Sequence, residues 1–582
     1  MKATNSKMIF GEVASQGMAR GSAVVCDCTA ETPIARHVID ENEVAQEIER
    51  FDAAVSAAEE KMLEVQQKTG RENGHDEAAI FEAHIALLHD PSLRETVSAL
   101  CQTSKLNVEA AVSEAIKTLS AAFARLDNPY FHERAADLRD IGNRLQQALA
   151  KDELPSIPDF PNGTVLVTRE LLPSVIMQLD EGAVCGMIVE QGGQTAHATI
   201  LARARGIPML IRVPNATETI DTGDQIIVDG LAGRVFINAT PQIQREYDRL
   251  EADLQAHKSA LRELIDLPSA TQDNTPIKLC ANVGKGADAV TAASVNADGV
   301  GLYRTEFLFL AQDDFPSEEE QYKMYLATTE RLKPREVAIR VLDIGSDKLL
   351  SYFPLAWEAN PSLGCRGIRL LLAHPEILNI QLRAILRLSA THPVSILFPM
   401  VGGLEDLRAA KAAIQRAKAA LATEGQPFNP EIRVGAMIET PAAVILAERL
   451  AQEVDFLSIG TNDLVQYLLA TDRTSSEVAA YYEPLHPAVL AALASVAAVA
   501  KKRGVNVSIC GEMAGNPAYT KLLIGLGFHN LSVNPGEILE IKNAIRSTNL
   551  QAAEKLARQV LKLGTVQEVK ERLHETESRG LS

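Results

Sequence analysis

The chain has 582 residues, 46% of them hydrophobic and 23% charged, which is typical of a globular protein with more than one domain. The 57 basic and 76 acidic residues leave a formal net charge of −19, so neither nucleic acid nor an anionic membrane surface is an expected partner. The first residues lack the apolar core of a signal peptide, no apolar run approaches a membrane span of roughly 20 residues, and the seven cysteines are dispersed, so we expect a cytoplasmic protein.

The first quarter of the chain changes character once. Short apolar stretches with glycine turns at 9–25 predict strands. From about 38 to 150 apolar residues recur every three or four positions with charges between them, which predicts a bundle of four or five helices. A proline-rich connector at 154–163 ends this region and is a predicted linker.

The next segment, 164–238, contains short apolar runs separated by glycine turns and one helical stretch at about 196–205. This pattern indicates a small α/β domain. A long polar amphipathic helix is predicted at about 241–266, and a second linker follows it.

From 276 onward apolar strands alternate with helical segments over roughly 300 residues, which predicts a (β/α)8 barrel. The eight strand candidates are 277–283, 299–307, 337–345, 365–371, 394–401, 433–440, 456–463 and 507–513.

The ends of these predicted strands carry chemically reactive side chains, and in such barrels the active site lies at the carboxyl ends of the strands. Glu439 and Asp463 are one βα unit apart, so they should lie on neighbouring strands and could share a Mg²⁺ ion. Several arginines at the same end would suit a small anionic substrate that carries carboxylate or phosphate groups. Each residue alone could form a structural ion pair, but their shared location favours a site. The other candidates are Arg304, Glu306, Arg340, Asp343, Arg366, Arg369, Asn462, Arg473 and Glu512.

Two cysteines follow predicted strands. A buried cysteine is usually a small apolar residue, but Cys510 faces the predicted arginines and could exchange a proton with a substrate. The residues alone leave both readings of Cys510 open. Cys365 has a similar position, and we expect it to be structural.

A second candidate site lies at 192–206. Gly192 and Gly193 predict a tight turn, Thr195 a helix N-cap, and His197 a place in the first helical turn. The positive end of the helix dipole favours a neutral, nucleophilic imidazole, and it would later stabilise a phosphate carried by that ring. A histidine near a helix start is often only a surface residue, and the flanking glycines weigh against that alternative.

Motifs in fixed order over nearly the whole chain resemble Enzyme I of the bacterial phosphoenolpyruvate-dependent phosphotransferase system. Residues 192–206 resemble its phosphohistidine signature, and ERAADLRDIGNRL resembles its carrier-docking helical region. The barrel motifs that resemble this superfamily are DGVGLYRTEFLF, LDIGSDK, NPSLGCRGIR, LFPMV, MIETPAA, SIGTNDLVQYLLATDR and ICGEMAG.

The resemblance implies an activity: the phosphoryl group of phosphoenolpyruvate passes to the chain's own histidine and then to a histidine of the small phosphocarrier protein HPr, for sugar uptake or regulation, with release of pyruvate. It also implies roles for the matching positions. These are His197 as the phosphoryl acceptor, Cys510 as the proton donor to the enolate, Arg304, Arg340, Asn462, Asp463 and Arg473 as substrate-binding residues, Glu439 and Asp463 as Mg²⁺ ligands, and Arg134 and Arg203 as support for the phosphohistidine or the docked carrier.

The fold that the resemblance implies is a multidomain α/β protein, with a swivelling phosphohistidine domain that contains an inserted helical bundle, followed by a (β/α)8 barrel that forms a homodimer. The two linkers at 154–163 and 240–275 are the expected hinges. The expected boundaries are 1–32 for N-terminal strands of the phosphohistidine domain, 33–152 for the carrier-binding bundle, 153–240 for the rest of the phosphohistidine domain, 241–275 for a helical linker and 276–575 for the barrel.

The chain departs from the family pattern near the histidine. Gln194 stands where Enzyme I usually has Arg, Ala196 where Ser is common, and Ile176 where a Thr hydrogen-bonded to the histidine ring is expected. Pro91 and Ser92 replace acidic residues of the docking segment, which points to a divergent carrier.

Two other functions are compatible with parts of the sequence. A pyruvate, phosphate dikinase or phosphoenolpyruvate synthase shares the two domains but needs a large nucleotide-binding domain, and the residues before His197 are mostly helical and lack a P-loop. A non-catalytic phosphorylation sensor would explain the changes at 194, 196 and 176 but not the full set of barrel residues.

Overall fold

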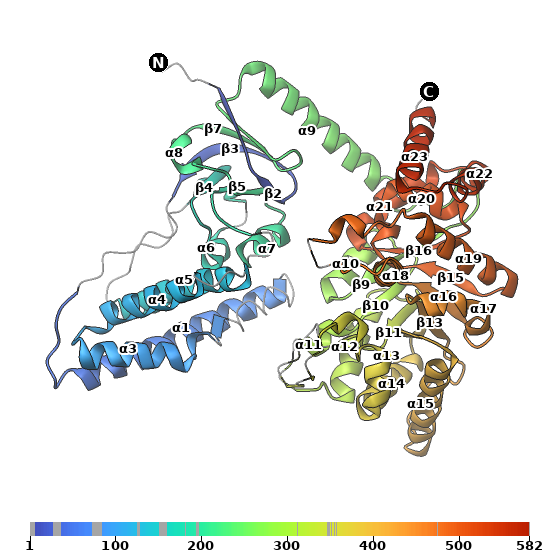
Figure 1. Cartoon of the computed structure of the whole chain (residues 1–582), viewed down its shortest axis with the longest axis horizontal. Coiled ribbons are helices and arrows are strands. Elements are labelled where there is room, and N and C mark those ends of the chain that lie inside the picture. The colour runs from blue at the N-terminus through green and yellow to red at the C-terminus, as the bar shows by residue number, and fades with distance from the viewer. Residues whose placement is uncertain are drawn as a thin grey trace. The chain divides into compact units, whose positions relative to one another are not determined.

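A computed structural model describes residues 6–580 except 27–35, 73–83, 86, 125–128, 151–159, 181, 194–196, 311, 313, 346–349, 351, 354, 357, 474 and 476. The chain divides into two compact units, Met1–Gln255 and Ala256–Ser582 (Figure 1). The predicted linker at 154–163 lies largely outside the described residues.

The first unit is built on an eight-stranded sheet in the order β1-β8-β7-β3-β4-β5-β6-β2. Within it β3 pairs in parallel with β4 and antiparallel with β7, so strands from the start of the chain form part of the same sheet. The strands are β1 Lys7–Phe10, β2 Glu12–Ser15, β3 Met18–Val25, β4 Thr164–Thr168, β5 Val184–Val189, β6 Met209–Ile211, β7 Gln225–Asp229 and β8 Arg234–Ile237.

The chain leaves this sheet between β3 and β4 to form a helical bundle, which confirms the expected α/β domain with an inserted bundle. The bundle has its own apolar core, which includes Phe51, Met62, Leu93 and Ile141. Its described helices are α1 Val44–Glu72, α3 Pro91–Thr103, α4 Val108–Ala124 and α5 Pro129–Leu149.

After β4 the chain returns to the sheet and adds the helices α6 Pro173–Gln178, α7 His197–Ala204, α8 Ala216–Thr219 and α9 Pro241–Arg262. The polar helix expected at 241–266 is therefore present. Its first part packs on the sheet, where the Tyr247 ring lies 5.3 Å from that of Phe236 and its hydroxyl donates to Asp229 at 2.6 Å. The boundary between the two units falls within α9.

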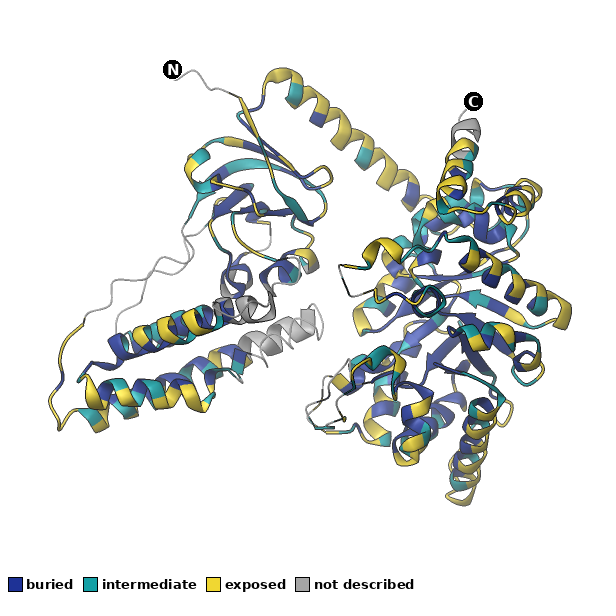
Figure 2. Ribbon diagram, in the orientation of Figure 1, coloured by how far each residue is buried: buried dark blue, intermediate teal, exposed yellow. Residues whose placement is uncertain are grey.

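The second unit is a closed barrel of eight parallel strands, which confirms the predicted (β/α)8 fold. Pairing of β16 with β9 closes the ring. The strands are deeply buried and the surrounding helices carry the exposed side chains (Figure 2). The strands are β9 Lys278–Val283, β10 Val300–Arg304, β11 Val337–Arg340, β12 Val394–Phe398, β13 Val434–Ile438, β14 Phe456–Ile459, β15 Asn506–Ile509 and β16 Asn530–Val533.

The helices of this unit cover the outside of the strands (Figure 1). They are α10 Gly286–Ser294, α11 Glu306–Leu310, α12 Glu318–Glu330, α13 Ile368–Ala373, α14 Pro375–Ser389, α15 Leu404–Thr423, α16 Pro441–Ile445, α17 Ala447–Leu450, α18 Thr461–Leu468, α19 Pro487–Arg503, α20 Pro517–Gly525, α21 Ile538–Arg546, α22 Leu550–Val560 and α23 Val566–Gly580.

One strand prediction is wrong. Residues 365–371 form a loop and the start of α13 rather than the fourth strand, and the eighth strand is the short β16, which the apolar pattern did not reveal. Gly367 precedes α13 with φ of +55°, a conformation that suits a turn and not a strand interior. The strands named fifth to eighth from the sequence are therefore the fourth to seventh, and Glu439 and Asp463 still follow neighbouring strands, β13 and β14.

No helix in the described part of the chain is both long and apolar enough to cross a membrane. Among the described residues six cysteines are free thiols: Cys26, Cys101, Cys185, Cys280, Cys365 and Cys510. Cys28 lies outside the described residues.

Candidate active site

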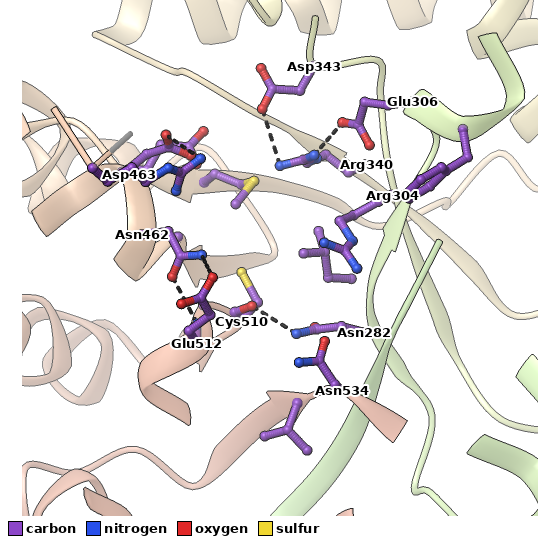
Figure 3. A pocket seen from close by; sticks show the side chains of 18 of the residues that line it. Asn282, Arg304, Glu306, Arg340, Asp343, Asn462, Asp463, Cys510, Glu512 and Asn534 are labelled. Atoms are coloured by element: carbon purple, nitrogen blue, oxygen red, sulfur yellow. Dashed lines mark hydrogen bonds and ion pairs between the residues drawn. The ribbon is translucent and has the colours of Figure 1, made fainter. Parts of the chain in front are cut away.

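A cavity of about 630 Å³ opens at the carboxyl ends of the barrel strands (Figure 3). It brings together most of the side chains that the sequence places at the strand ends, although Arg304 and Glu512, for example, are 208 positions apart in the chain. The polar residues that line it are Asn282, Arg304, Glu306, Arg340, Asp343, Arg366, Glu439, Asn462, Asp463, Arg473, Cys510, Glu512, Asn534 and Glu537.

Arg304 and Arg340 end the adjacent strands β10 and β11, and both project into the cavity (Figure 3). Arg340 is buried and is held by Glu306 and by Asp343, whose carboxylate lies 3.3 Å from its Nη1. Burial alone would lower the pKa of Arg340, but Glu306 and Asp343 raise it above the ordinary value. The Nε atom of Arg304 is buried and has no hydrogen-bond partner among the described residues. The guanidinium group of Arg340 therefore stays charged, and Arg304 keeps unused donor capacity.

Arg366 reaches the same cavity from the loop before α13. Its guanidinium contacts Asp343 at 3.0 Å and Asp463 at 3.6 Å, and these carboxylates raise its pKa against the effect of burial. Arg473 is more exposed and lies 3.7 Å from Asp463. Four arginines thus converge on one opening, and three of them face carboxylates, an arrangement suited to binding planar anionic groups.

Glu439 and Asp463 form the only pair of acidic side chains that the sequence predicts as metal ligands. Oε1 of Glu439 accepts a hydrogen bond from Met400 N at 2.5 Å, whereas Oε2 of Glu439 is buried without a hydrogen-bond partner among the described residues. Oδ1 of Asp463 also accepts no hydrogen bond from them and has only the longer ion-pair contacts with Arg366 and Arg473. Burial, followed by repulsion from Asp463, raises the pKa of Glu439 to about 8. Two crowded carboxylates with unsatisfied oxygens fit a hard divalent cation that takes its remaining ligands from water and substrate.

No cluster of three or more acidic, histidine or cysteine side chains suited to a metal occurs among the described residues. A cation at Glu439 and Asp463 would therefore rely on few protein ligands, which is usual for Mg²⁺ in phosphate-binding sites.

Cys510 follows β15, and its thiol is buried at the floor of the cavity (Figure 3). Its Sγ accepts a hydrogen bond from Ser458 Oγ at 3.2 Å and donates to the carbonyl of Ile459 at 3.4 Å. Burial raises the pKa of the thiol to about 11, and the hydrogen bond from Ser458 opposes that rise. At neutral pH the group is a protonated thiol, which can give a proton to a substrate.

Asn462 lies in the first turn of α18 and is fixed in orientation. Its amide donates to Glu512 Oε1 at 3.0 Å, and its side-chain carbonyl accepts from the backbone N–H of Glu512 at 2.9 Å (Figure 3). A side-chain amide held on both sides is pre-organised to meet a ligand in one orientation.

His197 is the first residue of α7 in the first unit, as the sequence predicts. Its side chain and that of Arg134, in α5, are not among the described side chains, and neither are residues 194–196, so the expected N-cap at Thr195 and the substitutions Gln194 and Ala196 lie outside the described residues. Gly192, just before this segment, has φ of +152°, in keeping with the predicted turn.

Two other residues near α7 are described. Arg203 donates from Nη2 and Nε to the carbonyl of Ala14 at 2.8 and 3.2 Å, and so ties α7 to β2. Ile176 is fully buried in the apolar core that it shares with Leu201 and Ala202 of α7. Its side chain packs in that core and offers no hydrogen-bonding group.

Sequence reasoning misplaced two residues and missed several. Arg369 is exposed and donates to the carbonyl of Leu363 at 3.3 Å instead of lining the cavity, and Cys365 is exposed in the loop before α13. Asn282, Ser458 and Asn534 were missed because isolated polar residues in or after a strand carry no motif. Asn282 donates to the backbone carbonyl of Cys510 at 2.9 Å (Figure 3).

Comparison with known proteins gives three family models along the chain: PEP-utilising enzyme, N-terminal, at 11–134; PEP-utilising enzyme, mobile domain, at 160–233; and PEP-utilising enzyme, PEP-binding domain, at 258–550. The phosphoenolpyruvate-protein phosphotransferase of Haemophilus influenzae is 38% identical over 98% of this chain and 99% of its own length. The proteins of the same name from Bacillus sp. and Bacillus subtilis are 37% and 36% identical, over 97% and 96% of this chain and 98% of their own lengths.

Proposed function

The chain belongs to the family of PEP-utilising enzymes and aligns along nearly its whole length with phosphoenolpyruvate–protein phosphotransferases, and from this premise we propose that it moves the phosphoryl group of phosphoenolpyruvate to His197 and then to a histidine of HPr or a similar small carrier protein. The observation that best supports the proposal is the convergence of four arginines, two unsatisfied carboxylate oxygens and one buried thiol in a single cavity.

Phosphoenolpyruvate carries a phosphate and a carboxylate, and each needs charge-assisted donors. Arg304, Arg340 and Arg473 are the proposed partners of these groups, with the oriented amide of Asn462 on the phosphate. Asp463 would act on the phosphate indirectly, as a ligand of the proposed metal site. Arg366, paired with Asp343, would hold the acidic groups in place.

Glu439 and Asp463 are the proposed ligands of Mg²⁺, which when bound would neutralise charge on the transferring phosphoryl group. The chain's own contribution is positioning: the arginines fix the substrate, and the burial of the cavity floor limits access of water to the reacting atoms.

His197 would attack the phosphorus in line with the leaving enolate oxygen. The location at the first residue of α7 supports this role, because the helix dipole disfavours the charged imidazolium and the free backbone N–H groups suit a phosphate. The enolate would then take a proton at its methylene carbon from the Cys510 thiol, which gives pyruvate.

The later steps involve the first unit and its partners. The inserted bundle is the proposed dock for the carrier, with Arg134 near the phosphohistidine, and Arg203 would steady α7 from its bonds to Ala14. We further propose that the phosphohistidine domain reorients between the two partners, that the barrel forms a homodimer, and that the enzyme serves sugar uptake or a regulatory pathway in the cytoplasm.

Incubation of the chain with ³²P-labelled phosphoenolpyruvate and Mg²⁺ tests the proposal. An acid-labile, base-stable label on the chain is expected, and His197→Ala should abolish it. The matched control is His257→Asn, because His257 is an exposed histidine of α9 that pairs with Glu540 at 2.8 Å, and this variant should keep the label.

Full labelling of His197→Ala would identify another acceptor, and no labelling of the unmodified chain would favour a non-catalytic sensor. Transfer of the label to candidate carriers from the same cell then identifies the partner.

A further inference from the structure

A line of serine hydroxyls runs from the catalytic thiol into the interior of the barrel. Ser458 Oγ donates to Cys510 Sγ at 3.2 Å, and Ser508 Oγ donates to Ser458 Oγ at 3.1 Å. Ser458 and Ser508 are partners in the register of β14 and β15, so the parallel pairing itself places the two hydroxyls side by side. Ser458 is completely buried. All donors in this line point toward the sulfur.

The line ends at a second, smaller cavity at the amino-terminal end of the barrel strands. Its volume is about 80 Å³, and Ser508 is one of its lining residues together with Lys278, Glu336, Arg433 and Asn506. Lys278 and Asn506 are exposed, so solvent can reach this end of the barrel. Apolar side chains, among them Phe456 and Val507, line the rest of this cavity, and its volume leaves room for ordered water beside the polar groups.

The proposed reaction leaves Cys510 as a buried thiolate after each turnover. Among the hydrogen bonds made by the described residues, the bond donated to Sγ comes from Ser458. The carbonyl of Ile459 can only accept, and the amide of Asn282 donates to the backbone oxygen of Cys510 and not to its sulfur. The geometry therefore offers the thiolate a donor on the side away from the substrate.

We propose that Ser458 and Ser508 form an internal proton relay that reloads Cys510 from solvent at the amino-terminal end of the barrel. This inference rests on the proposed function, in which the thiol protonates the enolate. In the first step the S–H bond breaks and a C–H bond forms on the methylene carbon.

The sulfur then takes the proton of Ser458, Ser458 takes that of Ser508, and Ser508 takes one from water in the small cavity. The net change is the uptake of one solvent proton for each pyruvate formed. Both serines are positioning residues for Cys510, because neither touches the substrate.

The test uses the full-length chain with Mg²⁺, phosphoenolpyruvate and ¹³C-labelled pyruvate in D₂O, and needs no carrier protein. Exchange of carbon label into phosphoenolpyruvate counts reversible phosphoryl transfers, because a thiolate left by one transfer can take its proton back from pyruvate. Incorporation of deuterium into the pyruvate methyl group counts exchanges of the thiol proton with solvent. The ratio of the two rates therefore isolates the relay.

The unmodified chain should incorporate deuterium continuously. Ser508→Ala should keep the rate of carbon exchange within about twofold of that of the unmodified chain. Once each Cys510 thiol has given up the one deuteron that it carries at the start, deuterium incorporation per carbon exchange should be at least tenfold lower. Ser508→Thr keeps the hydroxyl and has the small cavity beside it for its methyl group, so it should restore the ratio.

The matched control is Ser395→Ala. Ser395 lines the same small cavity, is buried and has no hydrogen-bond partner among the described residues, so both rates should stay unchanged.

Three results would overturn the relay. An unchanged ratio in Ser508→Ala would mean that protons reach Cys510 from the substrate side. An equal loss of both rates would mean that Ser508 only supports the fold of the site. Absence of carbon exchange in the unmodified chain would remove the proposed function and the relay with it.

Discussion

Burial acts on Cys510 and Glu439 in the same direction but with different chemical results. Both groups lose solvation, so both pKa values rise, to about 11 for the thiol and about 8 for the carboxyl. The thiol thereby stays a proton donor over the whole physiological range. The protonation state of the carboxyl instead depends on whether a cation is bound.

Cys510→Ala should slow pyruvate formation by a factor on the order of 10² to 10⁴, because a positioned general acid contributes about that much. The measurement is the rate of pyruvate formation in a single turnover, with the melting temperature as a check of the fold. Cys280→Ala is the matched control, since Cys280 is a buried barrel cysteine that lines the small cavity instead of the large one. An unchanged rate in Cys510→Ala would return this residue to a packing role.

Binding of Mg²⁺ should release a proton. The pKa of Glu439 is about 8 without a cation, so at pH 7 its carboxyl is largely protonated, and a metal ligand must lose that proton. Titration of Mg²⁺ in weakly buffered solution should release about one proton per chain at pH 7 and little above pH 9. Glu439→Gln should remove this release, and a release that persists in the variant would place the proton elsewhere.

The same group affects folding in the absence of metal. Its pKa is raised from 4.5 to about 8, so its contribution to stability is fully present below pH 4.5 and is lost as the pH rises toward 8. Chemical denaturation between pH 5 and 8 should show a slope of at most about 1.4 kcal/mol per pH unit from this group. Glu439→Gln should flatten it, whereas an equal slope in both proteins would contradict the shift.

At the scale of elements, the carboxyl ends of the barrel strands position the site, and small residues there leave room for the functional groups. Gly460 follows β14, and a Cβ atom built on it would lie 2.5 Å from Oε2 of Glu439 and 2.9 Å from the methyl group of Met437. Its φ of −82° is allowed for any residue, so the glycine is needed for space and not for its backbone conformation.

Gly460→Ala should therefore displace the Glu439 carboxylate and weaken Mg²⁺ binding by roughly 10-fold to 100-fold, the usual cost of disturbing the support of a metal ligand. Calorimetric titration with Mg²⁺ measures the effect. Gly286→Ala, at the first residue of α10, places its methyl group in open space and should bind normally. Equal affinities in the two variants would show that Glu439 tolerates the movement.

Strand ends were predictable from the sequence wherever an apolar run was long. The strands that carry Arg304, Arg340 and Cys510 were found in this way, and their side chains meet in the cavity. Residues 365–371 were wrongly predicted as a strand because a short apolar run does not distinguish a strand from the start of a helix. The strand β16 was missed because it has only four residues, of which two are polar, and because no motif follows it, whereas the equally short β15 leads into the ICGEMAG motif.

The hydrogen bonds between strands were beyond sequence reasoning. Ser458 and Ser508 lie 50 residues apart, and only the register of β14 with β15 brings their hydroxyls together. Asn282 meets the backbone of Cys510 only because the strands close into a ring, with β16 between β9 and β15. Motifs marked the side chains that line the cavity, but the hydrogen bonds beneath them depend on strand pairing that no local pattern encodes.

At the scale of the whole molecule, each hydrophobic core of described residues lies within one of the two units. Independent cores fold independently when little apolar surface is shared. We therefore expect two unfolding transitions in calorimetry of the full chain.

A fragment 256–582 should reproduce one of the transitions and bind phosphoenolpyruvate with Mg²⁺, yet acquire no label, because it lacks His197. A fragment 256–516 is the control: it lacks β16, so its barrel cannot close and it should not fold. A single transition in the full chain, together with an unfolded 256–582 fragment, would contradict the independence of the units.

The pairing of the cavity arginines has a consequence for selectivity. Arg340, Arg366 and Arg473 each lie beside at least one carboxylate of the chain, so at three of the four cavity arginines an entering anion does not meet a bare cation. The anion must displace carboxylates that already pair with these arginines. A trivalent phosphate ester therefore competes far better than a monovalent solute. The mouth of the barrel should thus bind chloride and simple monocarboxylates much more weakly than a phosphate ester.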